Sequence, residues 1–203
     1  MEVESRRIDS ERATPAIVPR AYQLEILRIA RARNTLAFLP TASGKTLIAI
    51  LLIQVRLEII RSEIGRGGSK KLIAFLAPTR VLVNQQKDSI QQHCRNCVVR
   101  DYTGDSSRQG KKIENLGVSE WKKEYQETDI MVFTPQILRQ VLEHGFVPVS
   151  LFDLIVLDEC HHAFGKDSMA VVCELVKRSP VKPLLLGLTG SPVPCKKVTT
   201  RRR

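Results

Sequence analysis

The segment TLAFLPTASGKT, residues 35–46, joins a short apolar run to a Gly-Lys-Thr triplet that opens a longer apolar run. Residues 35–39 predict a buried strand, residues 40–44 a turn, and residues 45–64 a helix. In such a strand–turn–helix unit, backbone N–H groups surround phosphate oxygens and the helix N-terminus adds positive potential. The segment therefore predicts a phosphate-binding loop in an α/β domain.

Short apolar segments alternate with amphipathic ones on both sides of this loop. Helical spacing of apolar residues predicts a helix over residues 20–33, before the first strand. The alternation predicts an α/β fold with a mostly parallel sheet and helices on both faces, and ligands bind such sheets at the carboxyl ends of the strands. Further strands are predicted at residues 72–76, 98–102, 130–133, 154–157 and 184–188, and further helices at 80–93, around Trp121, 135–144 and 168–178, with a polar surface loop at 104–117.

Length and composition favour one soluble domain. The chain has 203 residues, of which 43% are hydrophobic and 26% charged, and its formal net charge is +11. This charge favours a polyanionic partner. We expect a flexible charged lead-in at residues 1–19, one domain over 20–193 and a basic tail at 194–203. The lead-in has no apolar core typical of a secretory signal, so a cytoplasmic or nuclear location is expected.

Five cysteines, an odd number without a disulfide-type spacing, indicate a reduced intracellular protein. Cys94 and Cys97 form a CxxC pair, which is one half of a zinc or redox motif. No second CxxC or histidine pair follows it. A structural interpretation, in which Cys94 ends a helix and Cys97 opens a buried strand, is therefore preferred.

The loop itself departs from the strict phosphate-loop pattern. That pattern has glycine at the position of Leu39, and the related form with Pro-Thr-Gly has glycine at the position of Ala42. A Cβ at that position is costly if the backbone needs a positive φ. Lys45 is expected to reach the β- and γ-phosphates, and the Thr46 hydroxyl to bind Mg²⁺.

A second decisive segment, IVLDECH at residues 155–161, is an apolar strand that ends in two carboxylates. Asp158 is placed to hold Mg²⁺ opposite Thr46, and Glu159 to orient or activate the attacking water. Two solvated carboxylates at a strand end would need no such function. The phosphate loop at the end of another strand favours the catalytic interpretation.

These motifs together resemble the N-terminal ATP-binding lobe of superfamily 2 DExD/H-box helicases. The Asp-Glu-Cys-His form of residues 158–161 is most similar to Dicer-like proteins and the related double-stranded RNA sensors. The resemblance runs from about residue 20 to residue 193, and it implies a RecA-like P-loop fold that binds ATP and Mg²⁺. It implies that Gln23, in RAYQ, reads the adenine edge, and that His161 couples the nucleotide site to a later motif, while His162 is structural.

The remaining motifs lie at strand ends and carry further implied functions. They imply nucleotide contacts at Thr41, Ala42, Ser43, Gly44, Lys45 and Thr46, nucleic-acid contacts at Pro78, Thr79, Arg80, Thr103, Gly104, Thr134 and Pro135, and coupling of the two at Thr189 and Ser191. Alone, each segment is an ordinary strand-to-helix turn. Their order and spacing make the pattern specific.

The resemblance implies an RNA-dependent ATPase lobe of Dicer-like type that binds double-stranded RNA. Such enzymes use a second RecA-like lobe, expected here in cis or in trans, whose arginine stabilises transition-state charge. We therefore expect the isolated lobe to be nearly inactive, and no ribonuclease domain is expected within it. Two alternatives remain open: a non-catalytic module that binds RNA or protein, and a lobe of a DNA-repair helicase.

Overall fold

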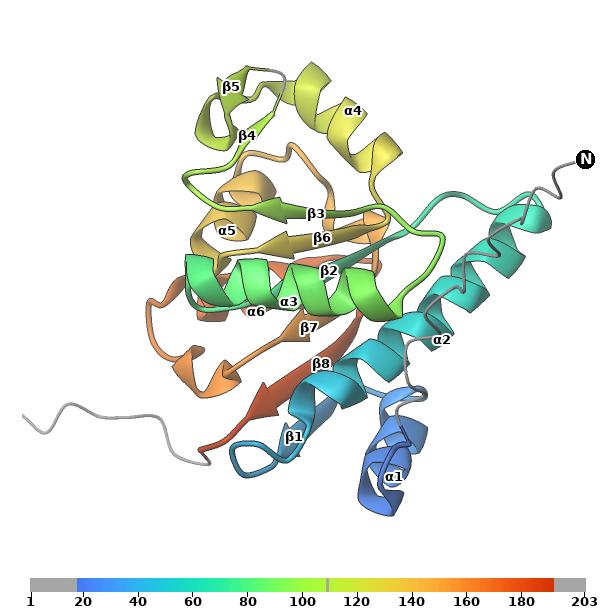
Figure 1. The fold of residues 1–203 in the computed structure, drawn as a ribbon. Coiled ribbons are helices and arrows are strands. Elements are labelled where there is room, and N and C mark those ends of the chain that lie inside the picture. The colour runs from blue at the N-terminus through green and yellow to red at the C-terminus, as the bar shows by residue number, and fades with distance from the viewer. Residues whose placement is uncertain (1–17, 109, 192–203) are drawn as a thin grey trace, which may run out of the picture.

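The computed structural model describes residues 18–108 and 110–191, so the expected tail and nearly all of the expected lead-in lie outside the described residues. Six parallel strands form one sheet in the order β1-β8-β7-β2-β6-β3 (Figure 1). The expected α/β fold is confirmed. The strands are β1 (Thr35–Phe38), β2 (Leu72–Leu76), β3 (Val99–Tyr102), β6 (Ile130–Phe133), β7 (Phe152–Leu157) and β8 (Leu184–Thr189).

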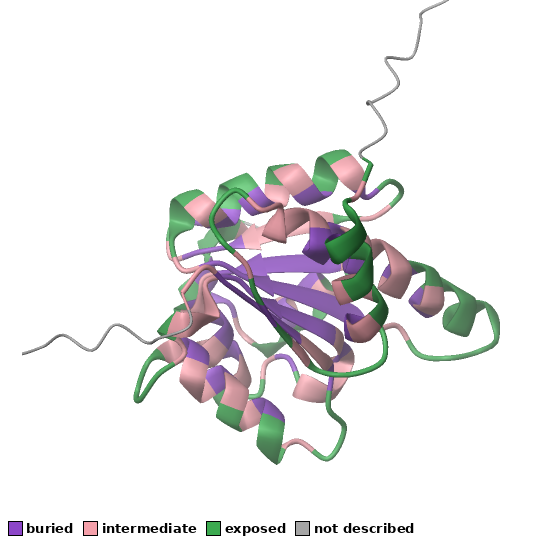
Figure 2. Cartoon of the chain, turned by 90° about the horizontal axis from the view of Figure 1, so that it is seen from below, coloured by how far each residue is buried: buried purple, intermediate pink, exposed green. Residues whose placement is uncertain are grey.

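Helices cover both faces of the sheet and create two separate apolar cores. Alternate residues of β2 belong to opposite cores, with Ile73 and Phe75 on one face and Ala74 on the other. Figure 2 shows the buried strands enclosed between the helical layers. The first face packs against α1 (Ala21–Ala30), α2 (Lys45–Gly65) and α3 (Arg80–His93), and the second against α4 (Val118–Glu127), α5 (Pro135–Glu143) and α6 (Ser168–Arg178).

The parallel pairing brings the carboxyl ends of the strands to one edge of the sheet. Phe38 pairs with Thr189, and Leu76 pairs with both Leu157 and Phe133. One more hydrogen bond continues the ladder beyond several strand ends, such as the 2.9 Å bond from the Asp158 amide to the Leu76 carbonyl. The loops after the strands therefore start at nearly the same level (Figure 1).

Local sequence signals explain where the helices at this edge begin. The Thr79 hydroxyl accepts a 3.3 Å hydrogen bond from the Leu82 amide and caps α3, while Asp167 accepts a 2.8 Å bond from the Met169 amide and caps α6. Pro135 occupies the first turn of α5, where its missing N–H costs nothing. Three helices consequently start with their N-termini at this edge.

Two expectations from the sequence were wrong in part. Residues 104–117 are more than a polar loop: they contain a small hairpin, β4 (Ser107–Arg108) with β5 (Lys111–Lys112), and the 3-10 helix η1 (Ile113–Asn115). Ile113 buries its side chain in the second core, which anchors this segment. Strand β1 is not fully buried, because it is the outermost strand of the sheet. Its Leu36 and Phe38 side chains are exposed.

Within residues 18–108 and 110–191, no helix has both the length and the apolar character needed to cross a membrane. The longest helix, α2, is instead packed across the sheet, and its buried side chains include Ile48, Leu52 and Leu57. Two 3-10 turns, η2 (Val149–Leu151) and η3 (Cys160–His162), flank β7.

A nearly buried ion pair fastens α2 to the sheet. The Arg56 guanidinium donates to both carboxylate oxygens of Asp153, at 2.6 and 2.5 Å, and only 19% and 12% of the two side chains are exposed. Hydrogen bonding to Asp153 raises the pKa of Arg56, although burial opposes this. The pair connects the middle of α2 to the start of β7.

Asp153→Ala should destabilise the fold, because the Arg56 charge would stay buried without a partner. We expect a loss of about 3 kcal/mol in the free energy of unfolding, measured by urea denaturation. Glu25→Ala is the matched control, since the Glu25–Arg28 pair is on the surface and its loss should leave the denaturation midpoint unchanged. Equal urea denaturation midpoints for Asp153→Ala and the unaltered chain would show that the Arg56–Asp153 pair does not stabilise the fold.

Candidate functional site

The loop between β1 and α2 is built around two left-handed residues. Ala42 has φ 63° and Gly44 has φ 78° and ψ 35°, and the Ser43 amide closes the turn with a 3.3 Å bond to the Pro40 carbonyl. Gly44 is the residue before the first helical position of α2, so the first amides of that helix lack intrahelical acceptors. The loop has the form of an anion-binding nest at a long helix.

Gln23 holds this loop from outside. Its side chain is 3% exposed, and its Nε2 donates to the carbonyls of Ser43 and Gly44 at 3.0 and 3.4 Å. Its Oε1 accepts a 2.8 Å bond from the Arg20 amide, and the Tyr22 hydroxyl donates to the Ser43 carbonyl at 2.6 Å. Both amide atoms of Gln23, expected to face an adenine, are therefore engaged with the backbone of this chain.

The loop also contains polar groups that fit a phosphate-bearing ligand. The Ser43 hydroxyl is buried and has no hydrogen-bond partner among the described residues. The Lys45 ammonium makes only long bonds to the carbonyls of Leu39 and Pro40, at 3.3 and 3.4 Å. A buried polar group without a partner costs roughly 1–3 kcal/mol, so a phosphate oxygen that accepts from these donors would be stabilising.

Asp158 lies at the end of β7 and is 7% exposed. Its Oδ1 accepts a 3.0 Å bond from the Glu159 amide, and its Oδ2 accepts a 3.2 Å bond from Nε2 of Gln86. Burial raises the pKa of Asp158, the Glu159 charge adds to the rise, and the Glu159 amide and the Lys45 charge oppose it. The loop and the acidic strand end also lie close together: a Cβ built on Gly190 would lie 3.4 Å from Nζ of Lys45, and the Gly190 amide donates to Oε2 of Glu159 at 3.4 Å. Thr46, in the first turn of α2, supplies a hydroxyl beside that loop.

A chain of contacts connects Glu159 to the end of β8. Glu159 has φ 48°, a strained conformation for a residue with a side chain, and its Oε2 lies 3.4 Å from both the Gly190 amide and Nδ1 of His161. His161 Nδ1 lies 2.8 Å from Oγ1 of Thr189, and that hydroxyl donates to the Ser191 carbonyl at 2.8 Å. The structure thus joins the three residues expected to couple.

A separate cavity lies away from the phosphate loop. It is a groove of about 920 Å³ further along the same edge, where the N-termini of α3, α5 and α6 meet. The groove brings together six of the residues expected to contact nucleic acid: Pro78, Thr79, Arg80, Gly104, Thr134 and Pro135. It is also lined by Val81, Glu114, Gln136, Ile137, His162, Asp167, Ser168 and Met169.

The charges in this groove are mixed. Arg80 is exposed and forms a close ion pair with Asp105, while Glu114 and Asp167 contribute carboxylates. The N-terminus of α5 adds positive potential to the groove, and the Thr134 side chain accepts no bond from an amide of that helix. Thr103 is not in the groove: it is 5% exposed, and its amide and hydroxyl both bond the Ser106 hydroxyl at 3.0 Å.

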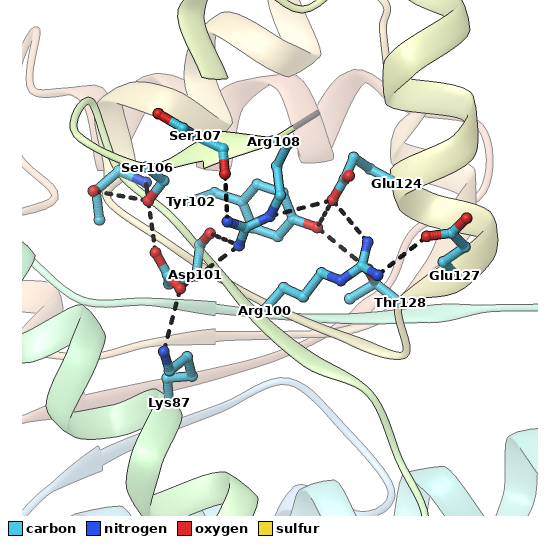
Figure 3. A network of polar contacts seen from close by, with 11 residues as sticks. Lys87, Arg100, Asp101, Tyr102, Ser106, Ser107, Arg108, Glu124, Glu127 and Thr128 are labelled. Atoms are coloured by element: carbon cyan, nitrogen blue, oxygen red, sulfur yellow. Dashed lines mark hydrogen bonds and ion pairs between the residues drawn. The ribbon is translucent and has the colours of Figure 1, made fainter. Parts of the chain in front are cut away.

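A partly buried polar network surrounds the end of β3 (Figure 3). The Glu124 carboxylate is 3% exposed and accepts from the Tyr102 hydroxyl at 2.9 Å and from Arg100 at 3.1 Å. The Arg108 guanidinium lies 5.3 Å from the Tyr102 ring centre and donates to the Asp101 carbonyl at 2.7 Å. Burial raises the pKa of Tyr102 above its ordinary range. The network ties the hairpin and α4 to β3.

Two residues of the site had no clear sequence signal. Gln86 reads as one more polar residue of an amphipathic helix, yet it is 5% exposed and bonds Asp158. His162, which was expected to be structural, is exposed and lines the groove, and its ring is tilted by 39° against that of His161 with ring centres 4.2 Å apart. Adjacent histidines after the acidic pair were the one available signal for His162.

The CxxC cysteines lie on the rim of the first core, away from this site. Cys94 caps the end of α3, and the Cys97 thiol donates to its carbonyl at 3.3 Å. Burial raises the pKa of Cys94 to about 12 and also raises that of Cys97. Such thiols stay protonated near neutral pH, which disfavours metal binding or nucleophilic chemistry.

Comparison with known proteins agrees with this geometry. The sequence profile of DEAD/DEAH box helicases matches residues 20–196. The helicase domain of Hef from Pyrococcus furiosus superposes with a TM-score of 0.69 and 30% identity, over 86% of this chain and 34% of that one. The fold and site therefore define a helicase-type domain, and the chain belongs to the DEAD/DEAH box helicase family.

Curated relatives place the chain more narrowly. It is 37% identical to Endoribonuclease Dicer homolog 1 of Arabidopsis thaliana over 90% of its own length, and 34% identical to Dicer homolog 2 over 96%. Dicer-like protein 1 of Pyricularia oryzae is 34% identical over 88%. The chain spans only 9–14% of the length of these three relatives. It is a helicase-type domain related to Dicer proteins and to Hef.

Gly44→Ala should disrupt the phosphate loop, because an added Cβ would lie 2.4 Å from Nε2 of Gln23 at a positive φ. We expect a loss of about 1–2 kcal/mol in the free energy of unfolding, measured by thermal denaturation. Ala42→Gly is the matched control: it removes strain at a φ of 63° and should cause no loss. A melting temperature that Gly44→Ala leaves unchanged, or that Ala42→Gly lowers strongly, would contradict the described loop.

Proposed function

We propose that this chain is the ATP·Mg²⁺-binding lobe of a Dicer-like, RNA-dependent helicase ATPase. The observation that carries the proposal is the meeting of three strand ends at one site. The phosphate loop follows β1, and Asp158 and Glu159 follow β7. The Thr189 contact to His161 lies at the end of β8, the strand between these two. Phosphate, metal and coupling functions need this arrangement, and a chance Gly-Lys-Thr would not supply it.

The residues divide the chemistry among them. Residues 41–46 would surround the phosphates with backbone amides, the Lys45 ammonium would bind the β- and γ-phosphate oxygens, and Thr46 and Asp158 would hold the metal. Bound Mg²⁺ supplies charge neutralisation at the transferred phosphoryl group. Glu159 would orient the attacking water and accept its proton. Its contacts to Gly190 and His161 keep that carboxylate beside the end of β8.

Efficient hydrolysis is proposed to need a second RecA-like lobe, in cis or in trans. An arginine from such a lobe contributes about 10³–10⁵ in rate in related NTPases. The phosphate loop is open in this chain: Thr41 and Ala42 are exposed. The lobe alone should therefore bind nucleotide and hydrolyse it very slowly. Turnover by the isolated chain at a complete helicase's rate would contradict this.

The groove at the N-termini of α3, α5 and α6 is proposed as the nucleic-acid track. Hydroxyls, helix N-termini and an arginine bind phosphates without reading base sequence. RNA is favoured as the ligand, because the Dicer relatives are named endoribonucleases, and its double-stranded form is proposed from the resemblance of residues 158–161 to Dicer-like proteins. Duplex DNA is the second candidate, because phosphate contacts of this kind serve either nucleic acid. Competition between the two duplexes at matched salt distinguishes them through the 2′-hydroxyl.

Lys45→Ala should abolish binding of nucleotide, because it removes the only side-chain ammonium of the phosphate loop. We would titrate the chain with a fluorescent ATP analogue in Mg²⁺. The unaltered chain should give a saturable signal, which the variant loses. Lys123→Ala, at an exposed position of α4, is the control and should bind normally. An unaltered chain without saturable binding would favour the alternative function, a non-catalytic RNA- or protein-binding module.

Arg80→Ala should weaken duplex RNA binding uniformly across sequences, because Arg80 is the one arginine or lysine lining the described groove. The slope of log affinity against log salt should fall in magnitude by about 1. Fluorescence anisotropy at several salt concentrations measures both. Arg28→Ala, on the exposed face of α1, is the control. If both variants weaken binding equally, general charge accounts for it and the groove is not the track.

A further inference from the structure

Gln86 is a polar residue on an otherwise apolar helix face. Val83 and Ile90, which precede and follow it on the buried face of α3, are both 0% exposed and belong to the first core. Gln86 is 5% exposed. Burial of a side-chain amide is unfavourable unless its N–H and C=O groups form hydrogen bonds. An apolar side chain of similar length would fill the same space, so packing does not account for the amide.

The Gln86 amide donates a hydrogen bond to the Asp158 carboxylate. Nε2 of Gln86 donates to Oδ2 of Asp158 at 3.2 Å, while the amide of Glu159 donates to Oδ1 at 3.0 Å. The carboxylate is therefore held at both oxygens, once by its own turn and once by α3. The other end of the Gln86 amide, Oε1, is buried and has no hydrogen-bond partner among the described residues.

We propose that Gln86 is a positioning residue that orients the Asp158 carboxylate for Mg²⁺ and connects α3 to the nucleotide site. The inference rests on the proposed ATP·Mg²⁺ function and adds a residue on a helix that none of the metal-binding motifs includes. Groups that hydrogen-bond a metal ligand fix its orientation, and their loss typically lowers metal affinity about 10–100-fold.

The position of Gln86 along α3 gives the contact a second consequence. Thr79 and Arg80, at the start of α3, line the groove at the strand ends. Gln86 lies two turns further on, about 10 Å along the helix axis from Thr79. A regular helix moves as a unit, so a ligand that shifts the start of α3 also shifts the donor to Asp158. Reciprocally, metal bound at Asp158 favours one position of α3.

A purely structural function of Gln86 makes a different prediction. If the amide only satisfies the buried Asp158 carboxylate, its loss would change the stability of the fold and leave the metal dependence of nucleotide binding as it was. If it orients the carboxylate, its loss changes the metal dependence specifically. Nucleotide affinity without metal depends on the phosphate loop and should stay unchanged in both cases.

The test measures Mg²⁺ dependence in Gln86→Met, which keeps the side-chain length and helix propensity but removes the donor. A fluorescent ATP analogue is titrated with the full chain, first in EDTA and then at increasing Mg²⁺. The readout is the Mg²⁺ concentration that half-maximally strengthens nucleotide binding. Gln85→Met, at the exposed neighbouring position, is the matched control, and Gln86→Asn, whose amide is too short to reach, is the second variant.

We expect the half-maximal Mg²⁺ concentration to rise at least about tenfold in both Gln86 variants, with unchanged affinity in EDTA and an unchanged Gln85→Met control. Half-maximal Mg²⁺ equal to that of the unaltered chain would overturn the positioning function of Gln86 alone. If the unaltered chain binds no nucleotide, the proposed ATP site fails, and this inference fails with it. Should Gln86→Met not fold, Gln86→Asn decides between the first two outcomes.

Discussion

The level carboxyl edge of the parallel sheet is the constraint on which the rest of this structure depends. Hydrogen-bond register places Phe38 beside Thr189 and Leu76 beside both Leu157 and Phe133, so the loops that follow all begin at one edge. Strand order then decides neighbours. The phosphate loop and the acidic pair are one strand apart, on either side of β8, and the groove lies beyond β7. Strand register and strand order alone therefore bring residues that are far apart in sequence to the same edge of the sheet.

Strain and burial concentrate at that edge, as they do at functional sites generally. Ala42 and Glu159 adopt left-handed backbone conformations that glycine would adopt more easily. Asp158 is held nearly buried with a raised pKa. The polar groups of Ser43 and Gln86 remain buried without full partners. Each of these is costly in the domain alone, and each is adjacent to where phosphate or metal would bind. The cores supply the compensating stability through aliphatic packing on both faces of the sheet.

Much of this was predictable from residue patterns, because strands and phosphate loops have local signals. Apolar runs between turns gave the six strands of the sheet to within one or two residues. The features that the sequence did not predict depend on contacts between residues far apart in the chain. The hairpin at 107–112 has polar two-residue strands, so periodicity could not reveal it. The exposure of Leu36 depends on which strand forms the sheet edge. Gln86 reads as a surface residue of an amphipathic helix, and the contacts of Gln23 to the Ser43 and Gly44 carbonyls have no local signal. Only tertiary packing shows that both amides hold the site.

The most direct test of the account is a backbone-amide NMR titration of the isotope-labelled chain with ATP analogue and Mg²⁺. The account predicts saturable shifts concentrated at residues 41–46, at 158–161 and at 189–191, with smaller shifts along α3 around Gln86. Amides of the opposite sheet edge, such as those near Asp153, should not move. Shifts scattered over the basic surface, or none at the three strand ends, would contradict a nucleotide site assembled by the carboxyl edge of the sheet.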